Sequence, residues 1–191
     1  MAADTRDRMI EATVAALQHH GVAGMSFTDV LRDSGAARGA IYHHFPGGKL
    51  QLVAQAAQLN GRQVREALAE LPADGPASVV SAFFDLVRPV VQASAAGGGC
   101  AVAAVTVGSG LESGERELRQ IADSAFSGWA QQLAERLSAS GLESGRAQDL
   151  ATTLIILLEG AHVLCRASGD VEPFERAART AASLVGDRPA A

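Results

Sequence analysis

Cysteine, aromatic residues and long apolar runs are all scarce in this sequence. Its 191 residues include two cysteines, Cys100 and Cys165, which lie far apart and in no metal-binding or redox spacing, so we expect two reduced thiols. No run of about 18 uncharged apolar residues occurs, and the first residues (MAADTRDRMIEA) lack the apolar core of a signal peptide. The sequence therefore predicts a cytoplasmic protein with no membrane span.

Positive charge is also in deficit, because the formal net charge is -5. That average argues against a nucleic-acid partner, but the charge is unevenly distributed. Residues 1–65 hold seven Lys+Arg and five Asp+Glu, a balance of +2, whereas residues 66–191 hold nine and sixteen, a balance of -7. A weakly basic first third and an acidic remainder suggest two parts with separate roles.

Motifs of catalysis and of metal binding are missing as well. The sequence contains no Gly-x-Ser-x-Gly, no His-Glu-x-x-His and no phosphate-binding Gly-x-x-x-x-Gly-Lys-Ser/Thr. Two pairs of histidines, His19-His20 and His43-His44, are adjacent in sequence, and neighbours on a helix point about 100° apart, so neither pair can face one metal ion. We predict no enzyme activity, no metal site and no cofactor.

Helix-forming residues in helical spacing are abundant, and alternating strand-like runs are few. We predict an all-α fold of about nine helices, in which an N-terminal three-helix bundle with a helix-turn-helix precedes a larger C-terminal helical domain. The clearest break is PADGP at residues 72–76. The predicted helices span about 4–20, 26–34, 38–44, 48–71, 77–95, 99–108, 114–140, 144–167 and 172–186.

Residues 34–45, SGAARGAIYHHF, match a helix-turn-helix motif. Gly35 stands where the turn needs a positive φ, and Ile41 is expected to point into the small core. The outer surface then carries the basic side chain of Arg38, which can bind guanine. Gly39 lies beside it and permits close approach of the backbone. Hydroxyl, ring and lysine groups nearby are suitable phosphate ligands. The predicted DNA-binding residues are Ser26, Thr28, Ala37, Arg38, Gly39, Tyr42, His43, His44 and Lys49.

The segment 26–52, SFTDVLRDSGAARGAIYHHFPGGKLQL, resembles the DNA-binding signature of the TetR family of transcriptional repressors. The family commonly has one residue between the proline and the lysine, where this chain has Gly47 and Gly48. Phe27 and Ala40 occupy positions at which other members often carry polar contacts. The Phe-Pro-Gly-Gly-Lys form and the later GCAVAAV resemble a subgroup that includes repressors of lincomycin and multidrug efflux genes.

The resemblance implies a homodimer that binds a palindromic operator in double-stranded DNA and releases it when a small, apolar effector binds. The implied domains are a helix-turn-helix DNA-binding domain (1–49), a linking helix (50–76) and a ligand-binding and dimerisation domain (77–191). The alternative is a helical small-molecule binding protein or enzyme whose N-terminal bundle is only structural.

Effector contacts are expected in the middle of the C-terminal half. Large apolar side chains from two predicted helices could line a pocket there, and two polar residues of a later helix could orient a ligand. The same aromatic residues would equally suit an ordinary core. The predicted ligand-binding residues are Phe83, Phe84, Val87, Val91, Phe126, Trp129, Glu159 and His162.

A dimer interface is expected on the last two helices. The apolar surface near residues 147–165 is wider than one face of a core helix needs, which favours a four-helix bundle of two subunits over a buried helix. The predicted dimerisation residues are Leu150, Leu154, Leu157, Leu158, Ala161, Phe174, Ala178 and Val185.

Overall fold

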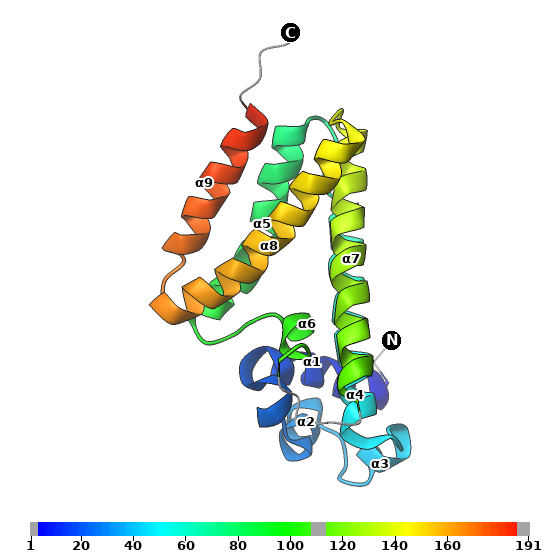
Figure 1. Cartoon of the computed structure of the whole chain (residues 1–191). Helices are drawn as coiled ribbons and strands as arrows, with labels where there is room; N and C mark the ends of the chain where they lie inside the picture. The colour runs from blue at the N-terminus through cyan, green and yellow to red at the C-terminus, as the bar shows by residue number, and fades with distance from the viewer. Residues whose placement is uncertain (1–3, 108–113, 187–191) are drawn as a thin grey trace. The chain divides into compact units, whose positions relative to one another are not determined.

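All regular structure in the described residues, 4–107 and 114–186 of this computed structural model, is α-helical (Figure 1), which confirms the predicted all-α class. Nine helices occur in that part of the chain. Their bounds are α1 Thr5–Gly24, α2 Phe27–Ser34, α3 Ala40–His44, α4 Gly48–Ala69, α5 Pro76–Ala95, α6 Ala101–Ala104, α7 Glu115–Ala139, α8 Ser144–Ser168 and α9 Glu172–Gly186.

Packing divides the chain into two compact units. The N-terminal unit comprises Met1–Arg62 and Cys100–Ala125, and the C-terminal unit comprises Gln63–Gly99 and Phe126–Ala191. The N-terminal unit is therefore built from two stretches that lie far apart in sequence. Two helices, α4 and α7, each contribute residues to both units.

The core of the N-terminal unit forms where α1 packs against α2 and α6. Apolar residues at helical spacing along α1 face this core, and the buried Thr13 satisfies its hydroxyl by donating to the carbonyl of Met9 at 2.7 Å. Fully buried side chains of the unit include Met9, Leu17, Val30, Ile41, Phe45 and Leu52.

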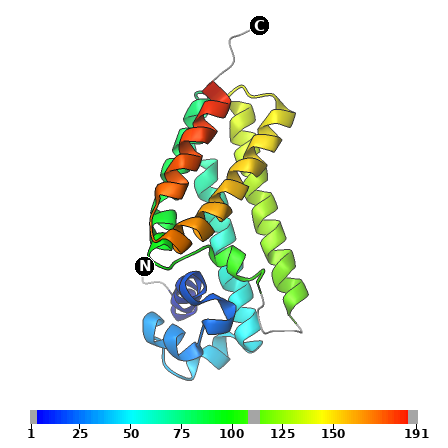
Figure 2. The same cartoon turned by 60° about the vertical axis from the view of Figure 1, so that its left-hand side comes forward.

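The C-terminal unit is a bundle in which α5, α8 and α9 each pack against the other two (Figure 2). Phe83 and Phe84 of α5 stack edge-on, and Phe84 packs in the same way against Phe174 of α9. Arg88 reaches from α5 to α9, where it pairs with Glu175 and lies 5.4 Å from the ring centre of Phe174. This interior is aromatic and closely packed.

The helix α8 is long and apolar enough to cross a membrane, by length and composition alone. A core helix of a helical bundle meets the same criterion. Here α8 packs on α5 and α9 and buries Leu154, Leu158 and Cys165, which accounts for its apolar character without a membrane.

One predicted helix, 99–108, is wrong over most of its length. The structure has only the single turn α6, with the Sγ of Cys100 accepting a hydrogen bond from the amide of Ala103 at 3.3 Å. After it, Thr106 bonds the carbonyl of Ala103 through both its amide and its hydroxyl, which ends the helix in a turn. Residue 108 and most of the predicted break at 108–115 lie outside the described residues.

Candidate DNA-binding site

One glycine and one hydrogen bond between residues close in sequence determine the turn between α2 and α3. Gly35 adopts φ 67° and ψ 20°, the left-handed conformation that ends a helix at no steric cost to glycine, as the sequence predicted. The amide of Ala40 then donates to the carbonyl of Ala37 at 2.9 Å, so Arg38 and Gly39 lie in a turn. The third helix thus begins at Ala40, two residues later than predicted.

Ser26 acts as the N-cap of α2. Its hydroxyl accepts from the amide of Asp29 at 3.2 Å and donates to the carboxylate of Asp29 at 2.6 Å. This hydrogen bond is the main cause of the lowered pKa of Asp29. Because the hydroxyl proton is already donated, a phosphate would have to displace Asp29 to bind Ser26, whereas Thr28 is exposed on the same helix.

The outer face of α3 carries the predicted DNA-binding side chains. Tyr42 is 69% exposed and His43 is exposed. The side chain of Ile41 is only 2% exposed, which agrees with the prediction that it points into the core. His44 is half-buried between the rings of His43 and Phe45. This side of α3 therefore offers hydroxyl and imidazole groups to a partner.

Three further predicted contacts differ in accessibility. Ala37 and Gly39 are exposed in the turn, where a partner's backbone or base edge can approach closely. Lys49 is half-buried at the start of α4, and burial lowers the pKa of its amine. The loop before it is tied down, because the amide of Gly47 donates to the side-chain oxygen of Gln51 at 2.8 Å.

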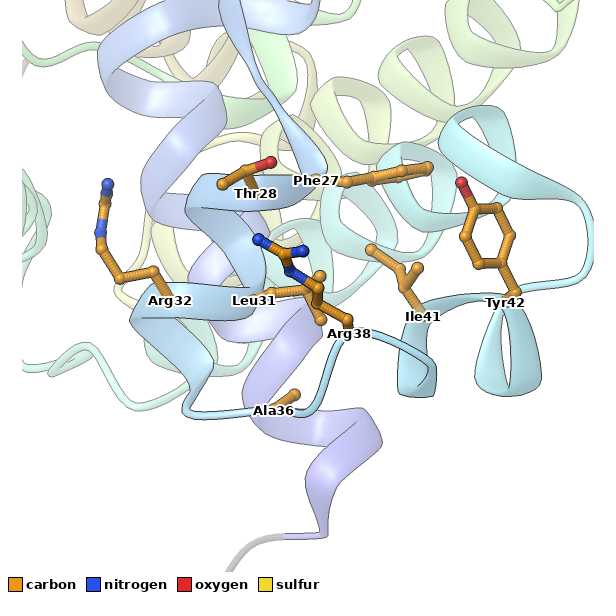
Figure 3. Close-up of a pocket in the computed structure, with 8 residues that line it drawn as sticks. All are labelled: Phe27, Thr28, Leu31, Arg32, Ala36, Arg38, Ile41 and Tyr42. Carbon is orange, nitrogen blue, oxygen red and sulfur yellow. The ribbon is translucent and has the colours of Figure 1, made fainter.

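A hollow of about 470 Å³ is lined by residues of α2, the turn and α3 (Figure 3). The guanidinium of Arg38 extends across it toward Thr28, above Leu31. On one side the ring of Phe27 meets that of Tyr42 edge-on, with centres 6.2 Å apart. The lining residues are Phe27, Thr28, Leu31, Arg32, Ala36, Arg38, Ile41 and Tyr42.

The two arginines of this hollow differ in whether a carboxylate of the described residues pairs with them. Arg32 pairs with Asp29 and Asp33, both at 2.8 Å, and these carboxylates raise the pKa of its guanidinium. Among the described residues no carboxylate lies within 4.0 Å of Arg38. Arg38 is therefore the cation that can form new charge-assisted hydrogen bonds, with a phosphate or with the acceptor edge of guanine.

Most of the predicted effector contacts lie in the closed core of the C-terminal unit. Their side chains are buried, except that Phe126 and Glu159 are half-buried. They fall into two aromatic clusters, one around Phe83 and Phe84 and one in which Phe126 meets Trp129 edge-on at 5.2 Å. The expectation that these residues contact an effector stays a prediction.

His162, one of these candidates, has a partner that the sequence did not reveal. Its Nδ1 lies 2.6 Å from the Oγ of the buried Ser94, and Ser94 also donates to the carbonyl of Val90 at 3.1 Å. Burial, helped by the nearby Arg166, lowers the pKa of His162 to about 4. A serine inside an apolar helix carries no distinctive sequence signal, so the sequence alone does not single out Ser94.

Four of the eight predicted dimerisation residues are buried inside the single chain. Leu154, Leu158, Ala161 and Phe174 are at most 4% exposed within a single chain, because they pack against the bundle's own helices. The large apolar side chains of α8 and α9 that remain more than half exposed are those of Ile156, Val163, Leu164 and Leu184. These four side chains are accessible in the single chain, and the dimer surface itself stays a prediction.

Within residues 4–107 and 114–186, no three His, Cys, Asp or Glu side chains come together in a group that could hold a metal ion.

Two family profiles match the sequence. One, for "Bacterial regulatory proteins, tetR family", covers residues 9–56, and the other, for "Transcriptional regulator LmrA/YxaF-like, C-terminal domain", covers residues 76–180. An uncharacterised HTH-type transcriptional regulator of Mycobacterium tuberculosis is 32% identical over 183 residues, which cover 94% of this chain and 93% of that protein. The HTH-type transcriptional regulator LmrA of Bacillus subtilis is 26% identical over 173 residues, 90% of this chain and 91% of LmrA.

Solved structures show the same fold. A TetR transcriptional regulator from Legionella pneumophila superposes with a TM-score of 0.82 at 20% identity, covering 97% of this chain and 100% of that one. The reduced form of NemR from Escherichia coli superposes with a TM-score of 0.80 at 19% identity, covering 96% and 98%. The chain therefore belongs to the TetR family of transcriptional regulators, in the subgroup with an LmrA/YxaF-like C-terminal domain, and it is a DNA-binding regulator and not an enzyme.

Proposed function

We propose that this regulator is a cytoplasmic repressor that binds a palindromic operator as a homodimer and releases it when a small effector binds. The observation that carries the proposal is the exposed Arg38, which has no carboxylate partner among the described residues, beside the exposed Tyr42 on one surface of the helix-turn-helix. An N-terminal bundle with a purely structural role gives no reason to present these groups together.

The contacts divide into two kinds. Arg38 has the geometry to bind the acceptor edge of guanine with two hydrogen bonds, and this contact would read sequence. Thr28, Tyr42, His43 and Lys49 would bind phosphates, and these contacts would position the protein on the duplex without reading sequence. Ala37 and Gly39 would let the turn approach the groove.

The dimer would form through the exposed apolar side chains of α8 and α9, namely Ile156, Val163, Leu164 and Leu184. Each of these side chains leaves apolar area in water that a second copy can cover. Two recognition helices would then enter successive major grooves, which requires a separation of about 34–36 Å.

Effector binding in residues 77–186 would act by changing that separation. A shift of a few Å would move both recognition helices out of register with the grooves and weaken operator binding. By thermodynamic linkage, operator DNA would weaken effector binding by the same factor. The aromatic side chains in the core of the C-terminal unit, Phe83, Phe84 and Trp129, favour an apolar effector.

The test is binding of the full chain to the DNA that flanks its own gene, at two salt concentrations. We expect log affinity to fall steeply with log salt, because bound phosphates release counterions. Tyr42→Ala and Lys49→Ala should weaken binding to every duplex, whereas Arg38→Ala should also relax base preference. Absent binding, or binding that ignores salt, would instead favour a helical small-molecule binding protein.

A further inference from the structure

The side chain of Phe27 lies on the surface proposed to meet DNA, yet it can neither donate nor accept a hydrogen bond. It begins α2, is only half-buried, and lines the hollow together with Leu31 and Tyr42. Its ring and that of Tyr42 form a T-shaped pair at an interplanar angle of 85° (Figure 3). The two rings thus make an apolar wall at one side of the hollow.

The opposite side of the hollow is charged. The guanidinium of Arg38 extends over Leu31 toward Thr28, and Arg38 has no carboxylate partner among the described residues. A ligand that fits must therefore offer an anionic or acceptor-rich edge next to an apolar group. The major groove of a duplex offers this combination, because guanine presents acceptors, thymine presents its 5-methyl group, and the backbone phosphates lie beside them.

We infer that Phe27 is a specificity-determining residue that reads the 5-methyl group of a thymine in the operator. Thymine carries the only apolar group on the major-groove edges of the four bases, and phenylalanine is among the side chains that contact it. A polar base edge covered by the phenyl ring would lose its water without gaining a hydrogen-bond partner, and this cost disfavours the other bases. Phe27 is also a positioning residue for Tyr42, whose ring it contacts edge-on.

This inference rests on the proposed operator binding, and its experiment keeps the two apart. The full chain first selects its preferred duplexes from a random library. Each thymine of the selected duplex is then replaced by deoxyuridine, symmetrically in both half-sites, and affinity is measured at fixed salt. Removing one buried methyl group should weaken binding about fourfold per half-site. The effect should be confined to one symmetric position.

Variants assign that position to Phe27. Phe27→Ala should abolish the thymine-to-uracil ratio there, and Phe27→Leu should retain part of it. Lys49→Ala is the matched control, because loss of a phosphate contact lowers affinity for both duplexes equally and leaves the ratio unchanged. Thermal melting of each variant shows whether it folds. A merely structural role of Phe27 would change affinity but not the ratio.

A second measurement needs no variant. Iodouracil, in which iodine replaces the methyl group, is placed at the sensitive position and irradiated in complex with the unaltered chain. Peptide mapping should find the cross-link at Phe27.

The inference is overturned if no replacement of thymine weakens binding, if the selected half-sites share no thymine, if Phe27→Ala keeps the ratio, or if the cross-link maps to other residues only. In each case the proposed function stands. If no duplex is selected at all, the proposed function fails first.

Discussion

The Nδ1 of His162 on α8 lies 2.6 Å from the Oγ of Ser94 on α5, and both side chains are buried in the C-terminal unit. Ser94 in turn donates to the carbonyl of Val90 at 3.1 Å, so the serine has one proton for two neighbours. The consistent arrangement is that Nδ1–H of His162 donates to Ser94, which leaves Nε2 unprotonated. A neutral histidine therefore joins two helices of the bundle.

Stability should fall in mild acid because of this histidine. Its pKa is about 4 in the folded chain against 6.5 for an ordinary histidine, so the unfolded chain binds the proton first. Stability is fully present above about pH 6.5 and is lost as the pH falls toward 4, by roughly 3 kcal/mol. Urea unfolding at pH 7.5 and pH 5 measures the loss.

His162→Gln should remove most of this acid-dependent loss, and His19→Gln, which alters an exposed histidine of α1, should keep it. An equal slope in all three proteins would show that His162 is not the responsible group.

Substitution by alanine should affect stability at one glycine of the recognition turn and DNA affinity at another. Gly35→Ala forces a side chain into φ 67° and should lower the free energy of unfolding by about 1 kcal/mol. Gly39→Ala has φ -75° and open space around the new Cβ, so stability should not fall. Operator affinity should nevertheless fall for Gly39→Ala, because the methyl group holds the turn away from the base edges. Chemical unfolding and DNA titration separate the two effects.

Lys49 is the only lysine in the sequence, which makes it a chemical reporter. If its amine binds a phosphate, operator DNA should protect it from acetylation, and the acetylated chain should bind DNA more weakly at every sequence. Mass spectrometry of the modified peptide, with and without duplex, gives the protection. Equal modification in both samples would remove Lys49 from the DNA-binding surface.

Ile156 tests the revised dimer surface. Ile156→Asp places a charge on an apolar residue that is 66% exposed in one chain, so it should leave the fold intact and shift the protein to monomers. Operator affinity should drop more than tenfold, because a monomer reaches one half-site. Gln131→Asp, on the exposed face of α7, is the control. Sedimentation velocity that finds dimers of Ile156→Asp would contradict the assignment.

Local signals explain why much of the helix-turn-helix could be predicted. Ser26 caps α2 because its oxygen accepts the free amide of Asp29, and Gly35 ends α2 because only glycine enters the left-handed region without strain. These interactions lie within four residues along the chain, so spacing alone revealed them. The predicted start of α3 is two residues early. The hydrogen bond from the amide of Ala40 to the carbonyl of Ala37 closes a turn there, and helix propensity does not distinguish such a turn from the first residues of a helix.

What spacing could not reveal depended on contacts between distant residues. The sequence by itself determined an all-α chain, a recognition turn with Arg38 and Tyr42 exposed, and a family signature. Only the tertiary structure decided that residues 100–125 join the N-terminal unit, that Ser94 partners His162, and that Phe27 meets Tyr42. It also decided which apolar residues of α8 face the bundle and which face water, because periodicity marks an apolar face without naming what covers it.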